Sequence, residues 1–146
     1  MLKNIDPLLT PELLSVLRRM GHGDEIAIVD ANFPAETNAR RLVRLDGVSA
    51  TAALAAIASV LPVDTYVDVP VQTMEVVGDK DAVPPIVGEF RQIIAASAEF
   101  DVQFGALERN AFYERARKSF AIVATGEKRL YGNVIVAKGV IDEGDS

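Results

Sequence analysis

The 146-residue chain has no cysteine and a single histidine, His22. The absence of cysteine excludes disulfide scaffolds, thiol nucleophiles and cysteine-ligated metal centres, and it is compatible with a reducing compartment. Because there is one histidine, a metal site built from several histidines of one chain is also excluded. Any acid–base chemistry that needs an imidazole must therefore use His22.

The chain also lacks an excess of positive charge and any long apolar run. Fifteen Lys and Arg residues against 21 Asp and Glu residues give a formal net charge of −6, which opposes the counterion release that drives nucleic-acid binding. No stretch reaches the roughly 18 apolar residues of a membrane span, and residues 1–7 do not resemble a secretory signal. We expect a soluble, cytoplasmic protein that binds neither nucleic acid nor membrane.

The length and the apolar content of the chain indicate one compact domain. We expect a single domain over residues 1–141, followed by an acidic, disordered tail at 142–146. Hydrophobic residues make up 49% of the chain and the mean hydropathy is +0.19, at the upper end for a soluble protein. This content indicates apolar surface that is buried between subunits.

Helical and strand patterns alternate along the chain. Thr10 and Pro11 mark the start of a first helix that should end at Gly21, and the apolar run 26–29 indicates a strand covered on both faces. This alternation predicts a single-domain, three-layer α/β sandwich with a mixed central sheet. The expected helices cover residues 11–20, 52–61, 84–94 and 108–118, and the expected strands cover residues 25–31, 42–45, 66–77, 121–124 and 134–137.

The only imidazole lies in a glycine turn, Gly21-His22-Gly23-Asp24. Flanking glycines let a ligand approach closely, and an ordinary pKa of about 6.5 makes histidine a natural proton carrier. The alternative role is structural, in which His22 interacts with the last carbonyls and the dipole of the preceding helix.

Polar residues also stand at the ends of two predicted strands. Asp30 follows the strand 25–31, and ligands of open α/β sheets bind at the carboxyl ends of strands. Tyr131, Gly132 and Asn133 precede the last strand, and their neutral donors and acceptors suit sugar hydroxyls. The alternatives are an aspartate that caps a turn and a simple strand-entry turn.

Taken together, six segments in this order resemble the D-ribose pyranase / L-fucose mutarotase family. The resemblance spans nearly the whole chain, and the combination of segments is more specific than any one of them. The segments are Met20–Asp24, Asp30–Pro34, Glu108–Ala116, Ala124–Glu127, Tyr131–Asn133 and Lys138–Val140.

The resemblance assigns a role to each candidate residue. It implies that His22 is the catalytic proton donor and that Asp30, Arg109 and the segment Tyr131-Gly132-Asn133 bind the sugar. The ribose branch tends to have histidine where this chain has Arg109, which favours fucose over ribose. Asn110 departs from the aromatic residue expected beside the arginine, and the identity of the sugar stays open.

The implied activity is that of an isomerase that interconverts the α and β anomers of L-fucose or a related monosaccharide. Opening the cyclic hemiacetal moves one proton from the anomeric hydroxyl and one to the ring oxygen, so no metal, redox group or other cofactor is required. The alternatives are a D-ribose pyranase, a non-catalytic sugar-binding module linked to a transport system, and a structural assembly protein. The resemblance also implies a ring-like homo-oligomer, for which a decamer is one candidate size.

The spacing of two candidate residues bears on that assembly. Asp30 lies eight residues after His22, and eight extended residues span up to roughly 26 Å, which one sugar cannot bridge. Either the glycine turn folds His22 back along the strand, or a neighbouring subunit supplies His22 to the site that contains Asp30.

Overall fold

The computed structural model describes residues 1–144. Residues 145 and 146 of the expected acidic tail lie outside the described residues, and residues 142–144 are exposed and form neither helix nor strand. The expected disorder of the tail stays a prediction. Within residues 1–144, no helix is both long and apolar enough to cross a membrane.

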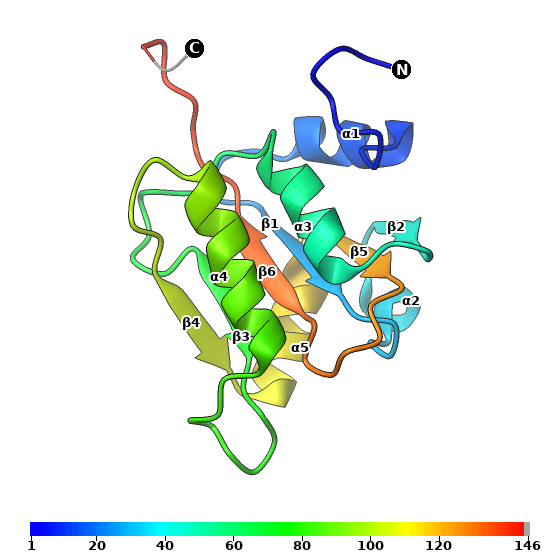
Figure 1. Ribbon diagram of the computed structural model, residues 1–146, viewed down its shortest axis with the longest axis vertical. Helices are drawn as coiled ribbons and strands as arrows, with labels where there is room; N and C mark the ends of the chain where they lie inside the picture. The colour runs from blue at the N-terminus through cyan, green and yellow to red at the C-terminus, as the bar shows by residue number, and fades with distance from the viewer. Residues whose placement is uncertain (145–146) are drawn as a thin grey trace.

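A six-stranded mixed sheet forms the centre of the molecule (Figure 1). The strand order is β2-β5-β1-β6-β3-β4, and β6 runs antiparallel to both of its neighbours, while the other paired strands are parallel. The predicted mixed sheet is therefore confirmed. The strands are β1 Glu25–Val29, β2 Leu42–Leu45, β3 Val71–Met74, β4 Phe104–Leu107, β5 Ala121–Thr125 and β6 Val134–Ala137.

Helices cover both faces of this sheet and complete the predicted three layers. In Figure 1, α3 and α4 lie in front of the sheet and α5 lies behind it. The buried apolar residues form two clusters, one with α1, α3 and α4 and the other with α2 and α5. The helices are α1 Pro11–Arg19, α2 Ala35–Asn38, α3 Ala50–Ala58, α4 Pro85–Ser97 and α5 Arg109–Lys118.

The register of β1 explains its wholly apolar sequence. Ile26 and Ile28 point into the cluster with α1, α3 and α4, whereas Ala27 and Val29 point into the cluster with α5. Successive side chains of a strand face opposite sides of the sheet, so a central strand with two covered faces needs apolar residues throughout.

Four elements differ from the sequence-based expectation. The strand expected over 66–77 is limited to β3, which begins only after Pro70, a residue with no N–H group to donate to a neighbouring strand. The edge strand β4 and the short helix α2 were not predicted. The helix expected over 52–61 is α3, which begins at Ala50 after the N-cap Ser49 and ends at Ala58.

The strand directions separate the loops of the sheet into two groups. Because β1 and β3 both run antiparallel to β6, they end at the same end of the sheet, where β6 begins. We call this the Asp30 end, since Asp30 directly follows β1. We call the opposite end, where β1 begins and β6 finishes, the His22 end; the N-terminal segment and the segment that follows β6 lie there in Figure 1.

Candidate functional site

A buried carboxylate–amide pair stands at the Asp30 end of the sheet. The backbone N–H of Asp30 donates to Asn133 Oδ1 over 2.8 Å, and Asn133 Nδ2 donates to Asp30 Oδ2 over 3.2 Å. The two residues are 6% and 4% exposed. Both hydrogen bonds join the end of β1 to the start of β6, so the pairing of these strands places Asn133 where it fixes the Asp30 carboxyl group.

Burial raises the pKa of Asp30 above its ordinary value. Removal from water disfavours the charged carboxylate, and hydrogen bonds from the backbone of Asn32 and Phe33 and the side chain of Asn133 oppose this effect only in part. Asp30 therefore exchanges its proton at a higher pH than an exposed aspartate does. A buried acid with a raised pKa in a cleft is a common feature of sites that handle protons.

Asp30 lines a pocket of about 180 Å³ that combines polar groups with an apolar wall. The end of β4 leads directly into α5, whose first residue is Arg109, and the Arg109 guanidinium lies 5.2 Å from the ring centre of Tyr113 one turn later. The pocket is lined by Asp30, Asn32, Phe33, Met74, Val77, Arg109, Tyr113, Leu130, Tyr131 and Asn133.

Tyr131 and Gly132 shape the loop that leads into β6. Tyr131 has a positive φ of 62°, and its hydroxyl accepts a hydrogen bond from the backbone N–H of Val77 over 3.0 Å. A Cβ atom at Gly132 would lie 2.8 Å from Glu127 Cγ, so this position admits only glycine without a shift of its neighbours. Gly132 does not line the pocket, but its backbone hydrogen bond to Asp30 lowers the pKa of that group.

His22 lies at the opposite end of the sheet. Its Nε2 atom is 3.0 Å from Asp64 Oδ1, and its ring centre is 4.7 Å from that of Tyr66. The His22 side chain is 45% exposed. Within residues 1–144, its hydrogen bond uses Nε2, and no hydrogen bond involves its Nδ1 atom.

The partner of His22 within the chain is Asp64, a residue that the sequence did not single out. Its side chain is 2% exposed and also accepts a hydrogen bond from the backbone N–H of Tyr66 over 3.0 Å. Its own N–H donates to Ala137 O at the end of β6. Because this burial depends on a contact 73 residues away along the chain, local sequence gave no signal for it beyond an acid shortly after Pro62.

The described chain does not bring His22 and the other candidate residues together. β1 has five residues and separates the two ends by about 16 Å at roughly 3.3 Å per residue. The glycine turn does not fold back along β1, since His22 contacts Asp64 and Tyr66 at the His22 end. One chain thus carries two separate groups: a pocket around Asp30, and an exposed imidazole held by Asp64.

Known proteins are similar to this chain in sequence and in fold over nearly their whole length. Fucose mutarotase from Bos taurus is 46% identical over 147 residues, which cover 96% of this chain and 94% of the relative. The crystal structure of the fucose mutarotase from Streptococcus pneumoniae in complex with L-fucose has a TM-score of 0.88 and 44% identity, covering 97% and 100% of the two chains. FucU from Bifidobacterium longum gives a TM-score of 0.90 at 42% identity, covering 96% and 100%.

A ribose-bound protein shares the fold at a greater distance in sequence. RbsD from Bacillus subtilis, solved in complex with D-ribose, has a TM-score of 0.75 at 21% identity and covers 97% of this chain and all of that one. At this identity the likeness concerns the fold alone. The model of the RbsD / FucU transport protein family matches residues 3–141. The chain therefore belongs to the RbsD / FucU transport protein family.

Proposed function

We propose that this protein is an L-fucose mutarotase, an isomerase that interconverts the α and β anomers of the free sugar. The observation that carries the proposal is the pocket around Asp30, in a chain 44% identical to a fucose mutarotase solved in complex with L-fucose. A cyclic hemiacetal opens when the anomeric hydroxyl gives its proton to water and the ring oxygen gains one from an acid, and the reverse steps after carbonyl rotation give the other anomer.

The lining of the pocket suits a deoxy sugar. Asp30, Arg109 and Tyr131 offer hydrogen-bonding groups to the hydroxyls, while Phe33, Met74, Val77 and Leu130 form an apolar wall. C6 of L-fucose is a methyl group, and an apolar wall receives a methyl group without leaving a polar atom unsatisfied. We assign the hydroxyl-bearing edge of the sugar to the polar side and the methyl group to this wall.

His22 is the proton donor of the proposed reaction. When Nε2–H donates to the Asp64 carboxylate, Nδ1 is the nitrogen left to exchange a proton with the ring oxygen. Asp64 fixes the orientation of the ring and balances the charge of the imidazolium. The sequence offers no second imidazole for this task.

The Asp30 pocket binds and orients the sugar. The Asp30 carboxyl group, whose pKa is raised by burial, accepts a hydrogen bond from a sugar hydroxyl, and Asn133 holds that carboxyl group in place. Arg109 stabilises negative charge that develops on oxygen when the ring opens. Tyr131 faces the sugar from the loop before β6, and Gly132 lets that loop pack closely against Glu127.

The separation of His22 from this pocket leads us to propose a site shared between two copies of the chain. In a head-to-tail ring, the His22 end of one subunit meets the Asp30 end of the next. The site would then be complete only in the oligomer. The expected ring, with a decamer as one candidate size, belongs to this proposal.

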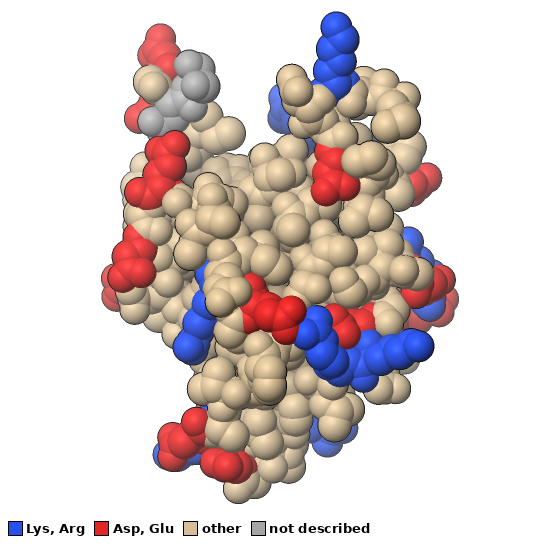
Figure 2. Space-filling model, in the orientation of Figure 1, with Lys and Arg blue, Asp and Glu red and all other residues tan. Residues whose placement is uncertain are grey.

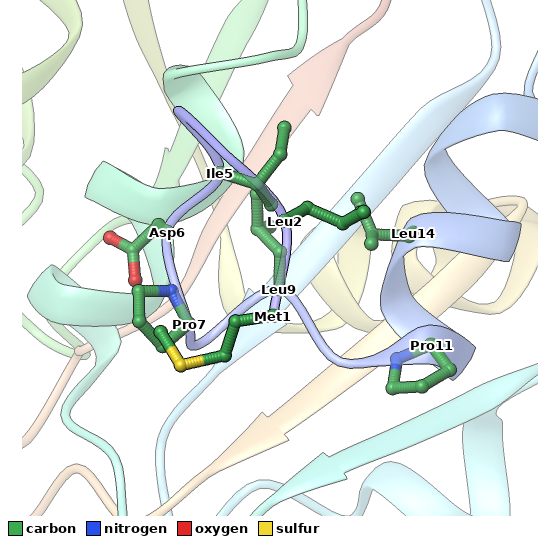
Figure 3. Close-up of a pocket in the computed structure, with 8 residues that line it drawn as sticks. All are labelled: Met1, Leu2, Ile5, Asp6, Pro7, Leu9, Pro11 and Leu14. Atoms are coloured by element: carbon green, nitrogen blue, oxygen red, sulfur yellow. The ribbon is translucent and has the colours of Figure 1, made fainter.

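The His22 end offers apolar surface for such a contact. The N-terminal segment forms a hollow of about 340 Å³ with α1, across which Leu2 and Leu14 reach toward each other in Figure 3. A second apolar hollow of about 450 Å³ runs from α1 to the segment after β6. Figure 2 shows a broad uncharged area between the two terminal segments. Tyr66, Val67 and Ile141 are 73%, 49% and 62% exposed near this end.

Two other functions remain as outcomes of the test. A D-ribose pyranase would act on ribose rather than fucose, and a sugar-binding module would bind without accelerating exchange. Arg109 and the identities of 46% and 40% to two fucose mutarotases favour the fucose activity. The cytoplasmic location and the absence of nucleic-acid binding stay predictions from the sequence.

Saturation-transfer NMR on L-fucose, D-ribose and D-galactose, without metal or nucleotide, tests the proposed activity. We expect faster exchange between the α and β anomers of L-fucose, with no change in sugar composition. His22→Gln should lower that exchange about 100-fold or more, the usual scale of general acid–base catalysis. Absence of any acceleration would leave the binding module, and acceleration of ribose alone would favour the pyranase.

A further inference from the structure

The contact between His22 and Asp64 joins two turns that are 42 residues apart in the sequence. His22 stands in the turn between α1 and β1, and Asp64 stands between α3 and β3. Neither turn contains a regular element that could hold its side chain in place. Both turns instead pack against residues 138 and 139, which directly follow β6.

Lys138 fixes the turn that carries His22 at both of its ends. Its Nζ atom donates to Leu17 O over 2.8 Å and to Met20 O over 2.6 Å, which are carbonyls at the end of α1. Its backbone accepts from Gly23 N and donates to Asp24 O, each over 2.8 Å. One residue thus supplies four hydrogen bonds around the turn, two of which satisfy carbonyls that a helix end leaves without partners.

Gly139 fixes the segment that carries Asp64. Its N–H donates to Pro62 O over 2.8 Å, and the preceding residue forms an antiparallel bridge with Val63. A Cβ atom at Gly139 would lie 2.6 Å from Val63 O and 2.9 Å from Asp64 Cα. Only glycine allows the chain to pass this close to Asp64 without moving it.

We propose that Lys138 and Gly139 form a clamp, made of positioning residues that hold His22 and Asp64 together for proton transfer. Each residue fixes one partner of the pair, and the peptide bond between them ties the two partners to each other. No hydrogen bond joins the clamp to the imidazole ring of His22 within residues 1–144, so it acts through the backbone. The inference rests on the proposed function of His22.

The clamp makes a prediction for kinetics that a purely structural role does not. A small displacement of a catalytic group can cost about 100-fold in rate, whereas the sugar pocket at the Asp30 end would stay intact. We therefore expect Lys138→Met to lower kcat for L-fucose about 10- to 100-fold and to leave KM nearly unchanged. Lys138→Arg keeps a cationic donor and should restore part of the rate.

Gly139→Ala tests the other half of the clamp, because it moves Asp64 and leaves the Lys138 ammonium in place. We expect the same selective loss of kcat. Two matched controls should leave kcat and KM unchanged. Lys118→Met removes an equal charge from an exposed pair with Glu114, and Gly88→Ala adds a methyl group where the structure has open space.

The single histidine allows a direct reading of its position in the free protein. In ¹H–¹³C correlation spectra the imidazole signals belong to His22 alone, and we expect both clamp variants to shift them while the two controls do not. Unchanged imidazole signals with full kcat would overturn the clamp. A loss of kcat that comes with an altered KM and a lower melting temperature would also overturn it, because such a variant is generally destabilised. If the native chain does not accelerate anomer exchange, the proposed function fails, and the imidazole signals still decide whether the clamp holds His22.

Discussion

At the scale of single residues, the proposed proton transfer depends most on the contact between His22 and Asp64. Replacing Asp64 with Asn removes the charge, and the amide can turn its NH₂ group toward Nε2 and so favour the other tautomer of the ring. We expect Asp64→Asn to lower kcat about 100-fold with little change in KM, as in other histidines that lose an orienting carboxylate. Kinetics by saturation-transfer NMR measure both constants.

Asp68→Asn is a matched control, since it makes the same change at an exposed residue of the same segment. It should leave both constants unchanged. Full activity of Asp64→Asn would mean that His22 needs no orienting carboxylate.

We expect the free energy of unfolding to depend on pH through Asp30. Burial raises the pKa of Asp30 in the folded chain, so the folded state binds this proton more tightly than the unfolded state does. The resulting stabilisation is fully present in acid and is lost as the pH rises through the folded-state pKa. Asp30→Asn removes this titration, and the free energy of unfolding of the variant should rise relative to the native chain across that range.

Urea unfolding at a series of pH values, from below about 4 to neutral, measures this difference. A difference that does not change with pH would contradict the role of burial at Asp30. The variant should also bind L-fucose more weakly, because an amide replaces the acceptor carboxylate.

Residue patterns could indicate Asp30 and Asn133, but they could not indicate Asp64. The first two stand where a strand ends or begins, and a strand is visible as a run of apolar residues. Asp64 is buried where its segment pairs with the end of β6, and this contact depends on how distant segments pack. The distance between His22 and Asp30 was also predictable, because the apolar run that indicates β1 lies between these two residues.

At the scale of elements, the loop between β5 and β6 presents Tyr131 and Asn133 to the pocket, and Glu127 holds it in place. The buried Glu127 carboxylate accepts from Arg129 Nη2 over 3.0 Å and from its Nε over 3.2 Å, and this interaction lowers the pKa of Glu127. Arg129 also pairs with Glu89 of α4. This network ties the loop to the helix in front of the sheet.

We expect Glu127→Gln to raise KM for L-fucose about tenfold and to lower the free energy of unfolding by about 1–3 kcal/mol, the usual cost of a buried polar group that loses its charged partner. Steady-state kinetics and urea unfolding measure the two effects. Glu99→Gln makes the same change at an exposed residue and should do neither. An unchanged KM would show that the loop keeps its position without Glu127.

The elements that the sequence predicted well have strong local signals. Thr10 and Pro11 mark the start of α1, and the apolar runs of β1, β5 and β6 identify central strands. β4 was missed because it is an edge strand of four residues that includes Gly105 and pairs with β3 alone. An edge strand depends on its neighbour for its conformation, and its own residues are too mixed to indicate it.

At the scale of the whole molecule, the sheet separates two halves of a site. The strand directions place Asp30, Arg109 and Tyr131 at one end and His22 with Asp64 at the other. The sequence alone left two alternatives: the glycine turn folds His22 back along the strand, or a neighbouring subunit supplies His22. The contact between His22 and Asp64 excludes the first alternative. The proposed ring joins the two ends, so activity should require an oligomer, which light scattering can size; a monomer would end the proposal of a shared site.

Mixing two inactive variants and measuring their anomer exchange of L-fucose tests directly whether two chains share one site. His22→Ala keeps the pocket, and Arg109→Ala keeps the proton donor. After joint unfolding and refolding at equal amounts, a shared site pairs an intact pocket with an intact His22 at about a quarter of the interfaces, if the chains combine at random. We predict that the mixture regains about a quarter of the native activity. A mixed oligomer with no regained activity would contradict the shared site, because it would place His22 and Arg109 of each site on one chain.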